Sequence, residues 1–154
     1  PRLDQTETYE AIRELQKFLE LYPTSPLSTD VQARIFTLQD KLVEKEYISA
    51  TQYYDMGTYF GNGGNGNYKA CITTAENAIK DYPYNKRRED FSFLILKAKF
   101  EYAKVSVESK QEERYNDAIE EYFSFCSYYP ESKYLKEANG LFKAAPDSYK
   151  PKTQ

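Results

Sequence analysis

Apolar residues recur along the chain at intervals of three and four positions, and one such pattern occurs three times. The copies span 8–23, 68–83 and 115–130, and each closes on Tyr-Pro. This spacing marks one face of an α-helix, which the closing proline ends. Three amphipathic helices of one pattern predict a helical repeat. The aligned face positions are Ala11, Cys71, Ala118; Ile12, Ile72, Ile119; Leu15, Ala75, Tyr122; Phe18, Ala78, Phe125; Leu19, Ile79, Cys126; and Tyr22, Tyr82, Tyr129.

The same spacing predicts further helices between the copies, so that the chain reads as six helices. The segment 27–60 has no proline or glycine before Gly57 and would form a helix roughly 50 Å long. Such a helix must serve more than one layer, unless it breaks near Lys45, where its apolar stripe changes register. The fourth segment is apolar on two faces and is therefore expected inside the stack. The predicted helices are 4–22, 27–60, 68–82, 87–108, 112–129 and 132–145.

Cap residues and prolines set the expected ends of the structured part. Asp4 or Thr6 could cap the first helix and Ser132 the last, because short polar side chains accept hydrogen bonds from free backbone amides. Pro146 ends the last helix, and residues 146–154 are expected to form a disordered tail. We therefore predict one helical domain over 1–145.

The segment 61–67 is rich in glycine and asparagine and matches G-x-G-x-x-G at Gly61, Gly63 and Gly66. The dinucleotide-binding fingerprint needs a strand before it, whereas a helix is predicted here. An inserted linker is therefore the favoured interpretation over a phosphate site.

Composition excludes several kinds of chemistry. The 154 residues carry a formal net charge of -3 and no histidine, so no imidazole is present for metal binding or for a catalytic triad. Cys71 and Cys126 occupy small or core positions of the repeat and are expected to pack, although a bridge between them stays open. No cofactor and no nucleic-acid face are predicted. The chain begins Pro-Arg-Leu, and we interpret it as part of a longer protein.

The alternation of helices, with ten residues between an Ala-Ile pair and a proline, resembles tetratricopeptide repeats. The intervals from Pro23 to Pro83 and from Pro83 to Pro130 are 60 and 47 residues, longer than the regular repeat. This order, with one very long helix, resembles the BamD-like lipoproteins of the outer-membrane β-barrel assembly machinery, in their C-terminal portion and Bacteroidetes-type form. The residues that carry the resemblance are Lys45, Glu46, Tyr47, Ala50, Tyr53, Tyr54, Gly57, Tyr59, Asp81, Tyr82 and Pro83, with Glu113, Arg114, Tyr115, Asp117, Ala118, Ile119 and 129–135.

The resemblance implies an all-α, right-handed repeat solenoid that acts as a scaffold and is not an enzyme. It implies a place on the periplasmic face of the bacterial outer membrane, held by a lipid anchor outside these residues. The implied partners are BamA-like POTRA domains, other assembly-machinery subunits and unfolded outer-membrane proteins.

Candidate contact residues are of two kinds. Sixteen tyrosines exceed the needs of a core, and tyrosine is favoured at interfaces. Three basic residues at the start of a helix oppose its dipole, which an acidic partner or the neighbouring Glu89 and Asp90 would offset. The candidates are Tyr47, Tyr53, Tyr59, Lys86, Arg87 and Arg88.

Three alternative functions are compatible with a helical chain of this kind or must be compared with it. A generic tetratricopeptide interaction module has the same pattern, and a SusD-like glycan-binding lipoprotein also uses such helices. The latter needs aromatic platforms on long loops, and this chain has no tryptophan. A lytic enzyme needs a pair of carboxylates in a cleft, and no pair is marked among the many acidic residues.

Overall fold

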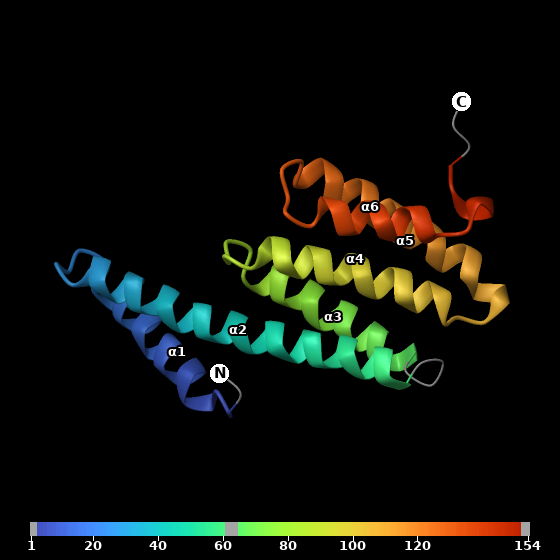
Figure 1. Ribbon diagram of the computed structural model, residues 1–154. Helices are drawn as coiled ribbons and strands as arrows, with labels where there is room; N and C mark the ends of the chain where they lie inside the picture. The colour runs from blue at the N-terminus through green and yellow to red at the C-terminus, as the bar shows by residue number, and fades with distance from the viewer. Residues whose placement is uncertain (1–2, 61–64, 152–154) are drawn as a thin grey trace.

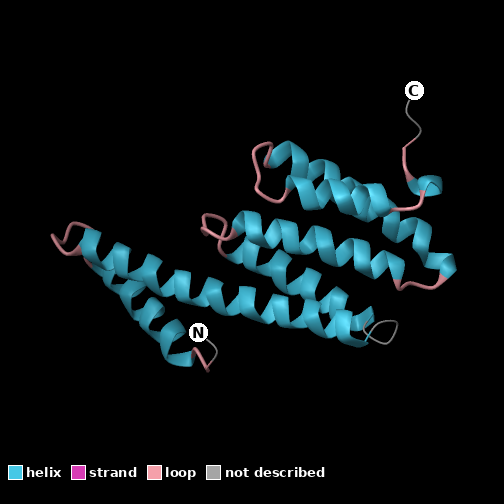
Figure 2. Cartoon of the chain, in the orientation of Figure 1, coloured by secondary structure: helices cyan, strands magenta, loops and turns pink. Residues whose placement is uncertain are grey.

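The computed structural model describes residues 3–60 and 65–151, which form six α-helices and one short 3-10 helix (Figure 1). Each helix packs on the next along the chain, and helices joined by loops make up the described residues (Figure 2). The predicted all-α stack of six helices is confirmed. The elements are α1 (Thr6–Leu21), α2 (Ser28–Phe60), α3 (Asn65–Asp81), α4 (Arg88–Lys104), α5 (Glu108–Tyr128), α6 (Leu135–Ala144) and η2 (Asp147–Tyr149).

Helix α2 is a single helix of 33 residues, so the break considered near Lys45 does not occur. Its first half packs on α1 around Ile12, Ile35 and Leu42, and its second half packs on α3 and α4. The hairpin of α1 and α2 therefore projects past the end of the α3 and α4 pair (Figure 1). One helix serves two layers, as its length required.

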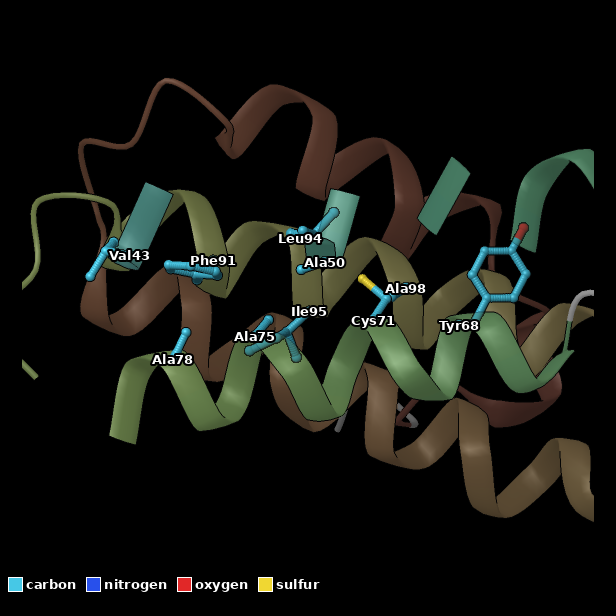
Figure 3. Packing of buried hydrophobic residues seen from close by; sticks show 10 residues of the cluster. All are labelled: Val43, Ala50, Tyr68, Cys71, Ala75, Ala78, Phe91, Leu94, Ile95 and Ala98. Carbon is cyan, nitrogen blue, oxygen red and sulfur yellow. The ribbon is translucent and has the colours of Figure 1, made fainter. Parts of the chain in front are cut away.

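Helix α4 is buried on two faces. Phe91, Leu94 and Ala98 belong to a core shared with α2 and α3, which Figure 3 shows from close by. Phe93 and Leu96 point into a second core shared with α5 and α6. The two apolar stripes read from the sequence thus face two different neighbours, and the predicted interior position of this helix is confirmed.

The three repeat helices differ in how completely they are covered. Cys71 of α3 and Ala118 of α5 have no exposed surface, because each helix has a neighbour on two sides. Ala11 of α1 is only partly buried, since α1 contacts α2 alone among the described elements. The small residue of the repeat therefore marks where two helices approach closely.

Several predicted boundaries were wrong. Helix α3 begins at Asn65, so residues 65–67 are helical and not part of a loop, while 61–64 lie outside the described residues. Helix α4 ends at Lys104 and α5 already begins at Glu108, so the three-residue connection lies four positions earlier than expected. The Ser106 hydroxyl donates to the Tyr102 carbonyl there, which occupies an acceptor that a longer helix would have used.

The expected capping side chains lie one or two residues before the actual cap positions. Asp4 accepts from the backbone N–H of Thr6 at 3.3 Å, yet Gln5 is the residue that precedes α1. Ser132 accepts from the backbone N–H of Tyr134 at 3.0 Å, and α6 begins only at Leu135. Asp4 thus satisfies the first amide of α1 from outside the cap position, whereas Ser132 organises the turn before α6.

Part of the tail predicted to be disordered has a defined structure. After Pro146 the chain forms η2, and the Tyr149 ring stacks on Tyr115 of α5 with centroids 5.1 Å apart. The Lys150 ammonium donates to the Lys143 carbonyl at 2.9 Å and to the Asp147 carboxylate at 2.8 Å. The segment 146–151 therefore packs against the first half of α5, and 152–154 lie outside the described residues.

Both cysteines are free thiols, so the bridge left open above is not present. Cys71 is fully buried in the core of α2, α3 and α4. Burial, and then the charge of Asp55, raises the pKa of this thiol to about 12. The side chain acts as a small apolar residue.

Gly57 is needed for the close approach of α2 and α3. A Cβ at this position would lie 2.7 Å from the ring of Tyr68, which is itself 2% exposed and cannot move aside.

We expect Gly57→Ala to lower the free energy of unfolding by about 1–3 kcal/mol, measured by urea denaturation. Gly140→Ala is the matched control, because nothing lies within 4 Å of its added Cβ. It should be neutral or stabilising by up to about 1 kcal/mol. Equal effects of the two substitutions would contradict this packing.

The raised pKa of Cys71 predicts slow alkylation. At pH 8 the thiol of the folded protein is almost entirely protonated, and only the thiolate reacts. Iodoacetamide should therefore modify Cys126 well before Cys71, as followed by mass spectrometry of the tryptic peptides. In urea the two sites should react at similar rates. Fast modification of Cys71 under native conditions would show that its surroundings open readily.

Candidate protein-binding surface

The structure brings two of the predicted basic residues against the middle of α2. The Arg87 guanidinium binds the Glu44 carboxylate through two contacts, Nε to Oε2 at 2.5 Å and NH2 to Oε1 at 3.1 Å. The Lys86 ammonium lies 3.1 Å from an oxygen of Asp40, one turn earlier on the same helix. The turn between α3 and α4 is thereby tied to α2 by two ion pairs.

Arg87 also contacts an aromatic ring and a second carboxylate close to it. Its guanidinium lies 4.4 Å above the ring of Tyr47, which in turn packs edge-on against Phe91 of α4. Asp90 is a further partner at 3.2 Å. Burial lowers the pKa of Arg87, but hydrogen bonding and charge from Glu44 raise it more, so the net pKa lies above its usual value. Arg87 and Tyr47 hold α2 and α4 together.

Local pairing of the basic run was expected with Glu89 and Asp90, and only Asp90 takes this role for Arg87. Glu89 instead accepts from the Ser132 hydroxyl at 2.5 Å, before α6. The main partner, Glu44, stands 43 positions away in the sequence and gives no local signal. The remaining basic residue, Arg88, is exposed and donates to the Pro83 carbonyl at 2.9 Å.

Tyr53 and Tyr59 lie further along α2 and form a separate group with Met56. Their exposed fractions are 36%, 85% and 38%, respectively. Tyr59 is about 18 Å along the helix axis from Tyr47. The predicted contact residues thus form two groups on α2. One surrounds the turn of residues 82–87, and the other lies near the end of the helix.

A groove of about 600 Å³ opens beside the first group. It lies between the end of α1, the first half of α2 and the turn that follows α3, and we call it the α1–α3 groove. It continues toward the tip of the α1 and α2 hairpin, past Phe36 and Pro23. The groove is lined by Gln16, Leu19, Glu20, Gln32, Ile35, Phe36, Gln39, Asp40, Val43, Asp81, Tyr82, Pro83, Tyr84 and Asn85.

The sequence did not mark this groove. Phe36 lies off the predicted stripe of its helix and Tyr84 lies in a turn, and they are 54% and 93% exposed. The only signal was the difference in length between α2 and α3, which leaves part of α2 without a neighbour. Among residues 3–60 and 65–151, no three Cys, Asp or Glu side chains gather as a metal site.

Comparison with known proteins finds similarity in the first part of the chain. The chain is an all-α helical stack, and the sequence model of an outer membrane lipoprotein family, YfiO, matches residues 2–64. The match covers α1 and α2, two walls of the α1–α3 groove, and less than half of the chain. It supports the BamD-like resemblance for that part. No curated protein matches the chain.

None of the helices among the described residues has the length and apolar character that a membrane span requires.

The two ion pairs at the turn should differ in strength. Arg87 and Glu44 are each about one-third exposed, bind through two contacts and have Tyr47 behind them, whereas Lys86 is 87% exposed. A double-mutant cycle with Arg87→Gln and Glu44→Gln should give a coupling energy of about 1 kcal/mol in thermal or urea unfolding. The cycle with Lys86→Gln and Asp40→Asn should give less than about 0.5 kcal/mol. A larger coupling energy for Lys86 and Asp40 than for Arg87 and Glu44 would show that lower exposure and the second contact do not determine the strength of these ion pairs.

Proposed function

We propose that the protein is a non-catalytic scaffold of the outer-membrane β-barrel assembly machinery, on the periplasmic face of the membrane. In this proposal it binds the POTRA region of a BamA-like partner and aids the insertion of outer-membrane proteins. The observation that carries it is the match of an outer membrane lipoprotein family to residues 2–64. The stacked helices support it, because such an array offers long faces to partner proteins.

The exposed members of the two residue groups are the proposed contact residues. Lys86 and Arg88 are exposed on the turn between α3 and α4, where they can meet acidic groups of a partner. Tyr53 and Tyr59 offer partly or largely exposed rings on α2. Aromatic and arginine side chains are enriched among residues that dominate binding energy.

Tyr47 and Arg87 have a different part in this proposal. Tyr47 is half-buried against the core of α2, α3 and α4, and Arg87 is bound to Glu44. They support the shape of the surface and hold the turn that carries Lys86 and Arg88. Substituting Arg87 would disturb that turn, so it is a poor probe of direct contact.

The proposal is tested by calorimetry of this chain with purified POTRA domains from the BamA-like protein of the same organism. We expect saturable binding that weakens about tenfold in the double variant Lys86→Glu with Arg88→Glu and also weakens in Tyr59→Ala. The pair Lys136→Glu with Lys143→Glu makes the same charge change on exposed positions of α6 and is the control.

Two results would count against the proposal. A folded, helical chain that does not bind POTRA domains would leave a generic tetratricopeptide interaction module as the better description. Equal weakening by the α6 pair and by the pair on the turn would mean that binding depends on overall charge and not on this surface.

A further inference from the structure

One face of α2 is formed by residues spaced seven positions apart. Another helix packs against only part of the length of this face. Val43, Ala50 and Gly57 belong to this face, and all three are buried where α3 packs on α2. The preceding member of the same series is Phe36, which is 54% exposed in the α1–α3 groove. Two helices that pack side by side along their length contact each other through side chains that recur every seven residues. The series indicates that the groove suits a helix.

The bounds of the helices give the length of α2 along which no helix packs on this face. Helix α3 ends at Asp81, whose turn lines the groove together with Val43 of α2. From Val43 back to Ser28, the start of α2, the axis extends roughly 22 Å, or about four helical turns. A helix placed there would lie along α2, in line with α3.

Charge in the groove favours one kind of helix. Glu20, Asp40 and Asp81 line it, and among the described residues its lining includes no lysine or arginine. Asp40 is paired with Lys86, but the Lys86 side chain is 87% exposed, and such pairs contribute little to stability. The carboxyl end of α3 also faces this space with the negative end of its dipole. The groove therefore favours a cationic occupant.

Apolar side chains supply the other half of the recognition. Leu19 of α1 and Phe36 of α2 line the groove, and Tyr84 stands 93% exposed beside it. Glutamine and asparagine side chains also line the groove and can accept or donate hydrogen bonds. An apolar stripe between acidic groups is the complement of a basic amphipathic helix.

We propose that the α1–α3 groove binds a cationic amphipathic helix of a partner protein, about four turns long, which continues the layer of α3 along α2. Its apolar face contacts Phe36 and Leu19, and its lysine or arginine side chains meet Glu20, Asp40 and Asp81. This site goes beyond the proposed function, since its charge is opposite to that of Lys86 and Arg88 and it requires a different partner surface.

The probe for this site is a fluorescein-labelled peptide of about 15 residues, with leucine along one helical face and lysine on the other. Fluorescence anisotropy with the full chain should show saturable binding that weakens as salt is raised. One control peptide has glutamate in place of lysine, and another has the same composition with the leucines scattered around the helix. Neither control should bind comparably.

Variants locate the binding on the protein. Phe36→Ser and the pair Glu20→Gln with Asp81→Asn should each weaken peptide binding about tenfold. Tyr128→Ser and the pair Glu112→Gln with Glu120→Gln, on exposed positions of α5, should change it less than twofold. Lys86→Gln releases Asp40 and should strengthen binding about twofold, although Lys86→Glu weakens POTRA binding in the proposed function. Circular dichroism checks that each variant keeps its helicity.

Four results would overturn the inference. If the groove and control variants lost peptide binding equally, the peptide would be binding to overall negative charge. If the scattered-leucine peptide bound as well as the amphipathic one, the groove would not be recognising an apolar helix face. Absence of peptide binding by the folded chain would exclude a cationic helix. Self-association in sedimentation that Phe36→Ser abolishes would assign the groove to a second copy of the chain. Each of these outcomes is independent of whether POTRA domains bind.

Discussion

The structure depends on the packing of one face of α2, because this face runs the length of a 33-residue helix while its neighbours are about half as long. Helix α1 covers the first half of α2 from one side, and α3 covers the second half from another. Where α3 packs, the face presents Ala50 and Gly57, and Gly57 allows the Tyr68 ring to lie directly on the helix backbone. Where α3 has ended, the same face presents Phe36 and is open. The position at which α3 ends therefore determines both the core and the groove.

The remaining helices depend on α4, which joins the two cores and is tied back to α2. Its buried faces are independent, since Phe91 and Leu94 pack toward α2 and α3 while Phe93 and Leu96 pack toward α5 and α6. A displacement of α4 would disturb both cores at once. The contacts of Arg87 with Glu44 and Tyr47 oppose such a displacement at the start of the helix, where the chain has just turned. This explains why a charged group is kept partly buried at that position.

The fold could be predicted because its signals are local. The repeated faces, the Tyr-Pro ends and the two stripes of α4 each lie within one helix, and periodicity alone reveals them. Helix ends were less predictable, since the start of α5 at Glu108 and the course of η2 depend on contacts such as Tyr149 on Tyr115. The candidate site was predicted only in part. The basic run was visible, but its partner Glu44 is distant in sequence, and the groove exists only because two helices differ in length.

Charge is divided in a consistent way around the turn between α3 and α4. On the groove side, Asp40 and Asp81 present carboxylates, while on the outer side Lys86 and Arg88 present cations. The pair of Lys86 and Asp40 lies at the boundary and is weak because Lys86 is largely exposed. The deeper pair of Arg87 and Glu44 is shielded on one face by Tyr47 and holds the backbone fixed. In both proposed complexes the turn would exchange its outer ion pair for contacts with a partner, while the pair of Arg87 and Glu44 keeps it in position.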